Sequence, residues 1–166
     1  MLFRSLPVER RVELVRLAEQ YKVLVVEDDA YTGIDLDGPP PTSLFEIARG
    51  QGILRVGTFS KTIATGLRVG WIAADPAAIA ALAFMRFDNG GAPFVQRTIY
   101  EYLKTGAYDP HVARLQAIYR ERRDAAMEAV RAECGELVAC RQPSGGFFLW
   151  LELKGGLDAV EVFEAA

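Results

Sequence analysis

The sequence predicts an α/β fold, and two observations carry this prediction. Short apolar runs at 23–26, 53–56 and 69–73, rich in β-branched residues, are typical of strands. They alternate with longer stretches whose apolar residues recur at helical spacing. With 166 residues, 51% hydrophobic and 25% charged, the chain is globular and long enough for one domain or parts of two.

The N-terminal elements follow from apolar spacing. A helix is expected over 6–21, beginning near Ser5, because its apolar residues form one stripe. The strand at 23–26 is expected to be fully buried, and the proline-rich residues 33–43 are expected to form a loop. The stripe of the first helix consists of Val8, Val12, Val15 and Ala18.

Three helices are expected after the third strand. The alanine-rich segment 76–87 is opened by an Asp-Pro pair, and Asn89-Gly90-Gly91 ends it. A second helix covers 94–104. A long helix covers 109–133, where the arginines at 120–123 are expected to form a solvated face.

The C-terminal part predicts two further strands and a helix. The strands are expected at 137–139 and 147–153, around a turn at 143–146 that contains proline and glycine. The last helix begins at Asp158.

Composition excludes several classes of function. The net charge of −3, without a basic block, predicts no nucleic-acid partner, and no apolar run is long enough to predict a membrane span. Cys134 and Cys140 lack the spacing of a disulfide framework or a metal site, so a reducing cytoplasm is the default. His111 is the single histidine, which argues against metal sites and Ser–His–Asp triads. We expect it to be exposed in the first turn of its helix.

The segment Thr58-Phe59-Ser60-Lys61-Thr62 combines hydroxyls and a lysine directly after a strand. Arg68 follows seven positions after the lysine, and hydroxyls, backbone N–H groups and one arginine in a loop can hold a phosphate. Lys61 beside them could form a Schiff base with an aldehyde cofactor. The alternative is a surface loop with a solvated lysine.

The segment Asp28-Asp29-Ala30-Tyr31 lies at the end of the first strand. In open α/β sheets, ligands bind at the carboxyl ends of strands. A carboxylate there could keep a pyridine nitrogen protonated, and Tyr31 could reach the phenolic oxygen of the same ring. The alternatives are a helix-capping or turn role for the aspartates and a packing role for the tyrosine.

Together the two segments resemble the large domain of the class I/II aminotransferases of fold type I, which depend on pyridoxal 5'-phosphate (PLP). The subgroup most similar to this sequence contains the kynurenine/2-aminoadipate aminotransferases and the PLP-binding effector domains of GntR-type regulators. The resemblance covers essentially the whole chain. It includes Glu9-Arg10-Arg11, the segments 108–111 and 119–123, and Gly145-Gly146-Phe147-Phe148-Leu149-Trp150.

The resemblance implies a role for each matching residue. Lys61 matches the Schiff-base lysine, which also moves the proton between the substrate and the cofactor. Asp28 matches the partner of the pyridine nitrogen, because its spacing to Tyr31 fits better than that of Asp29. Tyr31 matches the residue that hydrogen-bonds the phenolic oxygen. The implied phosphate binders are Thr58, Ser60 and Arg68.

The resemblance also implies an organisation and a reaction. Residues 1–105 would be part of the large PLP domain, a mostly parallel sheet with flanking helices, and 106–166 part of the α+β small domain. The reaction would transfer an amino group from an amino acid to a 2-oxo acid, in a cytoplasmic homodimer.

Several family features lie outside the sequence, so it resembles a fragment truncated at both ends. The Asn-Pro motif would precede Phe3, and the arginine that clamps the substrate carboxylate would follow Ala166. We therefore expect weak PLP binding and poor solubility. Three alternatives stay open: a GntR-type effector domain, a PLP-dependent C–S lyase and an inactive fragment.

Overall fold

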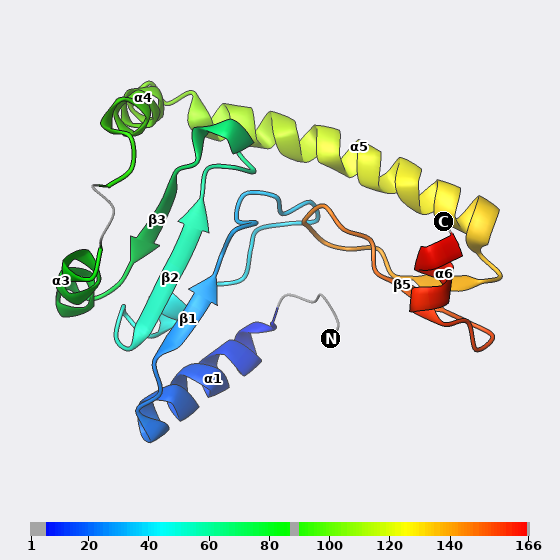
Figure 1. Cartoon of the computed structure of the whole chain (residues 1–166), viewed down its shortest axis with the longest axis horizontal. Helices are drawn as coiled ribbons and strands as arrows, with labels where there is room; N and C mark the ends of the chain where they lie inside the picture. Colours follow the sequence, from blue (N-terminus) through cyan, green and yellow to red (C-terminus); the bar gives the residue numbers. More distant parts are fainter. Residues whose placement is uncertain (1–5, 87–89, 166) are drawn as a thin grey trace.

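In the described part of the chain, two small sheets lie at opposite ends of one long helix (Figure 1). The structure is a computed structural model that describes residues 6–86 and 90–165. In the first sheet, in the order β1-β2-β3, β1 and β2 are parallel, whereas β2 and β3 are antiparallel. The strands are β1 (Val25–Asp28), β2 (Ile53–Thr58) and β3 (Gly70–Ala73).

The second sheet is an antiparallel pair at the other end of the long helix α5 (Figure 1). Its strands are β4 (Val138–Cys140) and β5 (Leu151–Leu153). The helices are α1 (Val8–Tyr21), α2 (Leu44–Ile47), α3 (Pro76–Phe84), α4 (Pro93–Lys104), α5 (Tyr108–Cys134) and α6 (Ala159–Ala165), and a 3₁₀ turn, η1, spans Thr65–Leu67.

Local capping explains where two of the helices begin. The Asp75 carboxylate accepts the N–H groups of Ala77 and Ala78 at the start of α3. Ser43 and Glu46 form a reciprocal capping box on α2. The backbone N–H and the hydroxyl of Ser43 donate to Glu46 and thereby lower the pKa of its carboxyl group.

The expected order of helices and strands is confirmed, with shifts at the boundaries. The short α2 was not predicted, because four residues carry no helical periodicity. Helix α3 ends at Phe84, where Met85 caps it, so the predicted extension toward residue 87 is wrong at its last described positions. The predicted helix start at Ser5 and the break at Asn89 lie outside the described residues.

The expectation of a fully buried first strand is wrong. The strand begins at Val25, and Val23, Leu24 and Val26 expose between 55% and 60% of their surface. A parallel strand is normally covered on both faces. Here β1 is an edge strand. The face that carries Val25 and Glu27 is better covered than the opposite face.

The segment after β1 joins the two halves of the molecule. Ile34 and Leu36 are 1% exposed, and their backbones bond to the turn before β5 through Gly146 N–H and Ser144 O. The Asp35–Gly145 bridge lies between these bonds. The segment therefore anchors the first sheet to the C-terminal part of the chain.

Arg123 strengthens this junction from α5. Its guanidinium donates to Asp37 at 2.6 Å and to the Pro143 carbonyl at 2.9 Å, and its side chain is 6% exposed. The expectation of a solvated face is therefore wrong at this position. Burial lowers the pKa of Arg123, but the bonds to Asp37 and Asp124 outweigh that effect and raise it.

Candidate functional site

The two predicted site segments meet at one edge of the first sheet. Asp28 is the last residue of β1, and Thr58 is the last residue of β2. The strands are parallel, with Asp28 opposite Val56, so both residues lie at the carboxyl edge. This edge is where open α/β sheets bind ligands.

A compact hydroxyl turn follows β2. The Thr58 hydroxyl lies 2.9 Å from Ser60 Oγ and 3.2 Å from the Val69 carbonyl, and it accepts the Ser60 N–H at 3.1 Å. The bonding capacity of Thr58 is thus used within the turn. When Thr58 donates to Ser60, the Ser60 proton remains available to an outside acceptor.

Arg68 ends the 3₁₀ turn η1 beside this loop, in a left-handed backbone conformation with φ 52°. Its neighbour Val69 accepts the Phe59 N–H at 3.2 Å, which brings the arginine back to the strand end. Arg68 is exposed, and in the described part of the chain no hydrogen bond or ion pair engages its guanidinium. It is free to bind an anion.

Lys61 points toward the segment that follows β1. Its Nζ lies 5.9 Å from the centroid of the Tyr31 ring. That ring also meets Phe147 and Phe148 edge-on, with centroid distances of 5.7 and 6.1 Å. Aromatic residues before β5 thus pack against Tyr31, the ring that Lys61 approaches, and spacing along the sequence does not reveal this contact.

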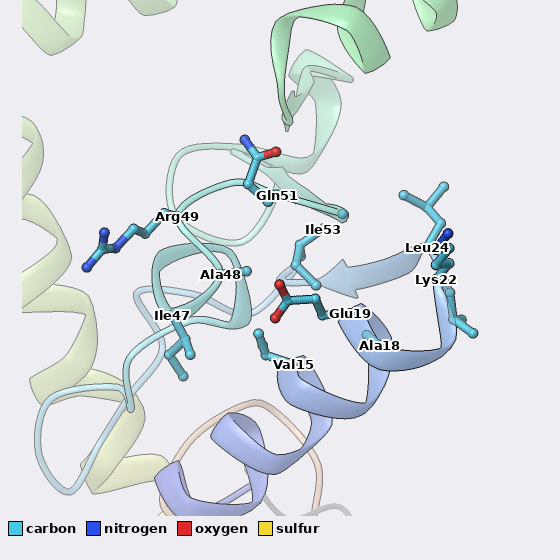
Figure 2. A pocket seen from close by; sticks show the side chains of 12 residues that line it. Val15, Ala18, Glu19, Lys22, Leu24, Ile47, Ala48, Arg49, Gln51 and Ile53 are labelled. Carbon is cyan, nitrogen blue, oxygen red and sulfur yellow. The ribbon is translucent and has the colours of Figure 1, made fainter.

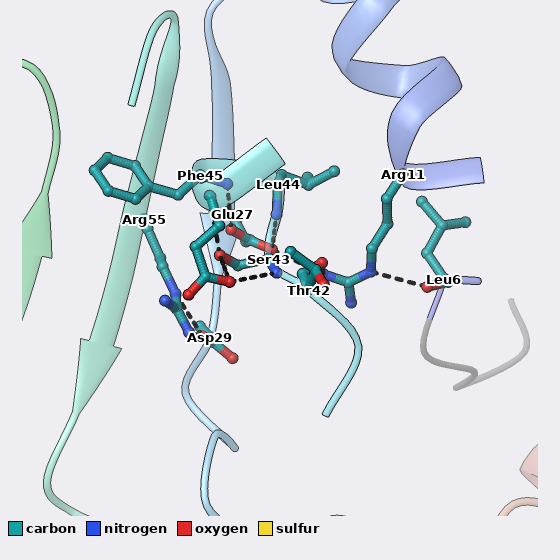
Figure 3. A network of polar contacts seen from close by, with 10 residues as sticks. Leu6, Arg11, Glu27, Asp29, Thr42, Ser43, Leu44, Phe45 and Arg55 are labelled. Carbon is teal, nitrogen blue, oxygen red and sulfur yellow. Dashed lines mark hydrogen bonds and ion pairs between the residues drawn. The ribbon is translucent and has the colours of Figure 1, made fainter. Parts of the chain in front are cut away.

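The structure distinguishes between the two aspartates after β1. Asp29 accepts two bonds from Arg55, one of them from Nε at 2.7 Å (Figure 3). The Asp28 carboxylate is exposed and accepts only the Ala30 N–H at 3.2 Å among the described residues. Asp28 is therefore the carboxylate with free acceptor capacity.

A separate network holds the opposite side of β1. Glu27 accepts bonds from Arg11 and from the backbone N–H groups of Leu44 and Phe45, at 2.9 to 3.1 Å (Figure 3). All of these groups are satisfied within the fold. The network therefore attaches α1 and α2 to the strand and leaves Asp28 on the other face.

The turn that carries Lys61 is also held by α5. Tyr108 donates its hydroxyl to Thr62 at 2.9 Å, and His111 Nε2 lies 3.0 Å from the Thr62 carbonyl. The expectation of an exposed His111 is wrong, because this contact half-buries the ring. No local motif signals a contact across 49 residues of sequence.

The donors and acceptors at this edge fit PLP, the cofactor that the sequence motifs imply. Ser60 and Arg68 offer hydrogen-bond donors suited to a phosphate. Asp28 offers an anion suited to a protonated ring nitrogen, and Lys61 offers a primary amine. The roles of these residues stay predictions, but the fold brings their segments together.

One cavity lies away from the predicted site residues. It has a volume of about 480 Å³ between α1 and the connection from α2 to β2, and Val15, Ala18 and Ile53 line it (Figure 2). None of the predicted site residues contributes to its wall. A second cavity of about 260 Å³ lies between α5 and the turn before β5, with Phe147 and Phe148 in its wall.

Other kinds of site find little support. Across residues 6–86 and 90–165, no cluster of three or more His, Cys, Asp or Glu side chains is placed to hold a metal ion. Within the same ranges, no helix combines the length and apolarity needed to cross a membrane. Cys134 and Cys140 are free thiols.

A family model and curated relatives match nearly the whole chain. The model for aminotransferase class I and II matches residues 4–165. An uncharacterized HTH-type transcriptional regulator, YisV of Bacillus subtilis, is 33% identical over 93% of this chain. Aromatic-amino-acid aminotransferase 1 of Thermococcus litoralis is 33% identical over 95% of it. The chain spans only 32% and 38% of the lengths of these relatives.

Solved structures show the same fold. Kynurenine aminotransferase from Pyrococcus horikoshii, in complex with PMP, superposes with a TM-score of 0.88 at 32% identity. The α-aminoadipate aminotransferase LysN from Thermus thermophilus superposes with a TM-score of 0.85 at 33% identity. The matches cover 96% and 95% of this chain, and 40% and 42% of those chains. The fold is therefore part of the fold type I aminotransferase architecture.

Proposed function

The chain belongs to the aminotransferase class I and II family, and on that premise we propose that it supplies the lysine side of a PLP site for transamination. The observation that carries the proposal is the convergence of Asp28, Lys61 and the hydroxyl turn at one sheet edge. The parent protein would transfer an amino group from an amino acid to a 2-oxo acid.

Each residue has a role that suits its surroundings. When bound, PLP would supply an electron sink at the substrate α-carbon. Lys61 would hold the cofactor aldehyde through its Nζ and, once the substrate amine has replaced it there, would move the substrate proton. Asp28 holds the proton on the ring nitrogen, because its carboxylate is free of cationic partners among the described residues. Tyr31 donates its hydroxyl to the phenolic oxygen.

The phosphate end is proposed to rest on Ser60 and Arg68. Both present donors that the described part of the chain leaves available. Thr58 was predicted to bind phosphate directly, but its hydrogen bonds lie within the turn. We propose that Thr58 instead orients the Ser60 hydroxyl toward the phosphate.

The proposal extends to the parent protein. Residues 1–105 would belong to its PLP domain and residues 106–166 to its small domain. The parent would be a cytoplasmic homodimer, and free Cys134 and Cys140 suit a reducing compartment.

A titration with PLP tests the cofactor site. The purified chain is mixed with increasing PLP, and the absorbance of the imine bond is followed. We expect a weak, saturable signal that disappears in Lys61→Ala and persists in Lys104→Ala, an exposed lysine paired with Glu101. An identical signal in both variants would refute the assignment of Lys61.

A second function has specific support, because a transcriptional regulator is 33% identical over 93% of this chain. The alternative is that the parent uses the same PLP site as an effector domain of a GntR-type regulator. Incubating the PLP-loaded parent protein with an amino acid, and measuring release of the 2-oxo acid, separates the two. PLP binding without release of the 2-oxo acid would favour the effector role.

A further inference from the structure

Two side chains at the start of α5 hold Thr62, the residue that follows Lys61. The Tyr108 hydroxyl donates to Thr62 Oγ1 at 2.9 Å. His111 Nε2 lies 3.0 Å from the Thr62 carbonyl. A carbonyl only accepts, so this ring nitrogen carries the proton and donates it. One helix, α5, therefore binds both the hydroxyl and the backbone carbonyl of Thr62.

Packing makes this contact difficult for water to replace. Thr62 is 1% exposed. On one side, the Tyr108 ring meets Phe59 edge-on, with centroids 6.4 Å apart. On the other side, Gly33 lies so close that an added Cβ would be 3.0 Å from the Thr62 methyl group. The Lys61 turn is thus wedged between α5 and the segment after β1.

The second nitrogen of the imidazole has its own neighbour. Arg114 Nη2 lies 3.4 Å from His111 Nδ1. Arginine can only donate, so Nδ1 is the acceptor in this arrangement. The arginine therefore favours the tautomer that places the proton on Nε2, toward Thr62.

We propose that Tyr108 and His111 are positioning residues for Lys61. They fix the backbone at Thr62 and so keep the lysine amine directed toward Tyr31 and the sheet edge. The consequence for cofactor chemistry rests on the proposed function, whereas the effect on the lysine itself does not. Neither residue touches the reacting atoms, so both act through the turn.

The test measures the chemical reactivity of Lys61 in the full chain without cofactor. An amine-specific acylating reagent is applied, and mass spectrometry gives the rate at Lys61 relative to the exposed Lys22. His111→Phe removes the donor and keeps a ring, whereas His111→Gln keeps an N–H donor. Tyr108→Phe removes only the hydroxyl and keeps the ring on Phe59.

The control acts on the same helix at a different contact. Gln116 donates to the Gly33 carbonyl at 3.3 Å, one turn beyond His111. Gln116→Leu removes this bond and leaves both bonds to Thr62 in place. It therefore reports the effect of loosening α5 without releasing the lysine turn.

Loss of one hydrogen bond should make local opening of the turn about fivefold more frequent. We expect the Lys61 to Lys22 rate ratio, and amide exchange over residues 59–64, to rise about fivefold in His111→Phe and in Tyr108→Phe. His111→Gln should restore the original ratio, and Gln116→Leu should leave it unchanged.

Other outcomes would overturn the proposal. One is an unchanged ratio in His111→Phe and Tyr108→Phe. Another is equal acceleration at all four lysines, which would indicate general loss of structure. If the wild type forms no imine with PLP but the ratio responds as expected, the proposed function fails and the positioning role stands.

Discussion

Replacing the two neighbouring aspartates after β1 should have opposite consequences for stability and for chemistry. Asp29→Ala removes the partner of Arg55, and Asp28→Ala removes a carboxylate that bonds only the Ala30 N–H among the described residues. The two changes delete the same atoms at adjacent positions. Any difference between them therefore reflects the environment of each side chain.

The structure sets the size of the expected difference. The side chains of Arg55 and Asp29 are each 22% exposed, so Asp29→Ala leaves a mostly buried guanidinium without its anion. Hydrogen bonds to charged groups predict a loss of about 2 kcal/mol in the free energy of unfolding. The exposed Asp28 loses one backbone contact, which predicts about 0.5 kcal/mol.

Urea denaturation measures the first effect. With a slope of about 2 kcal/mol per molar urea, the midpoint should fall by about 1 M in Asp29→Ala and by about 0.25 M in Asp28→Ala. In the PLP-loaded parent protein, exchange of the substrate α-proton should fall at least about tenfold in Asp28→Ala, equivalent to about 1.4 kcal/mol. Equal urea midpoints, or slower proton exchange only in Asp29→Ala, would refute the distinction between the aspartates.

Three further predictions concern stability. Arg123→Met should lower the free energy of unfolding by about 2 kcal/mol, because it leaves Asp37 unpaired. The control Arg122→Met, at an exposed position, should change it by less than about 0.5 kcal/mol, and the urea midpoints of the two variants measure the difference. Burial raises the pKa of Asp35, so the folded state holds this proton more tightly and the free energy of unfolding falls as pH rises through the folded pKa. Asp35→Asn should therefore raise the free energy of unfolding by about 1 kcal/mol at pH 7 and leave it unchanged at pH 3, as measured by thermal melts. Gly57→Ala should lower the free energy of unfolding by about 1–3 kcal/mol, because the new Cβ would lie 2.2 Å from the Trp71 ring. Urea unfolding followed by tryptophan fluorescence should then show a lower midpoint.

Local features of the fold and site were predictable from the sequence. The apolar spacing of 6–21 and the Asp-Pro start of α3 act within a few residues, and both elements formed close to their expected positions. The ends of the first two strands lie two residues beyond the predicted 26 and 56, at Asp28 and Thr58, because β-branched runs and their polar ends lie together in sequence.

Features that depend on distant contacts were not predictable. The β-branched character of Val23, Leu24 and Val26 indicated burial, but exposure depends on which elements cover the strand. Arg123 is buried because Asp37 and Pro143, from two other segments of the chain, contact it on α5. A sequence pattern records the type of a side chain and not its neighbour from another element.

The hydrogen bonds of Thr58 likewise depend on geometry that the sequence does not show. A threonine after a strand, followed by Ser and Lys, indicates a phosphate-binding turn. Only the geometry shows that the Thr58 hydroxyl bonds Ser60 and the Val69 carbonyl. The choice between Asp28 and Asp29 was made from spacing to Tyr31, and the Arg55 contact now supports it on independent physical grounds.

The most direct test of the central claim is to locate the lysine that bonds PLP. The chain is mixed with PLP, the imine is reduced with borohydride, and peptide mass spectrometry compares labelling at Lys22, Lys61, Lys104 and Lys154. Arg68→Gln serves as the matched variant, because it removes the positive charge and the guanidinium fork proposed to hold the phosphate and leaves the lysine. We predict label mainly at Lys61 and a marked decrease in Arg68→Gln. Equal labelling of the four lysines, unaffected by the Arg68 substitution, would contradict the account.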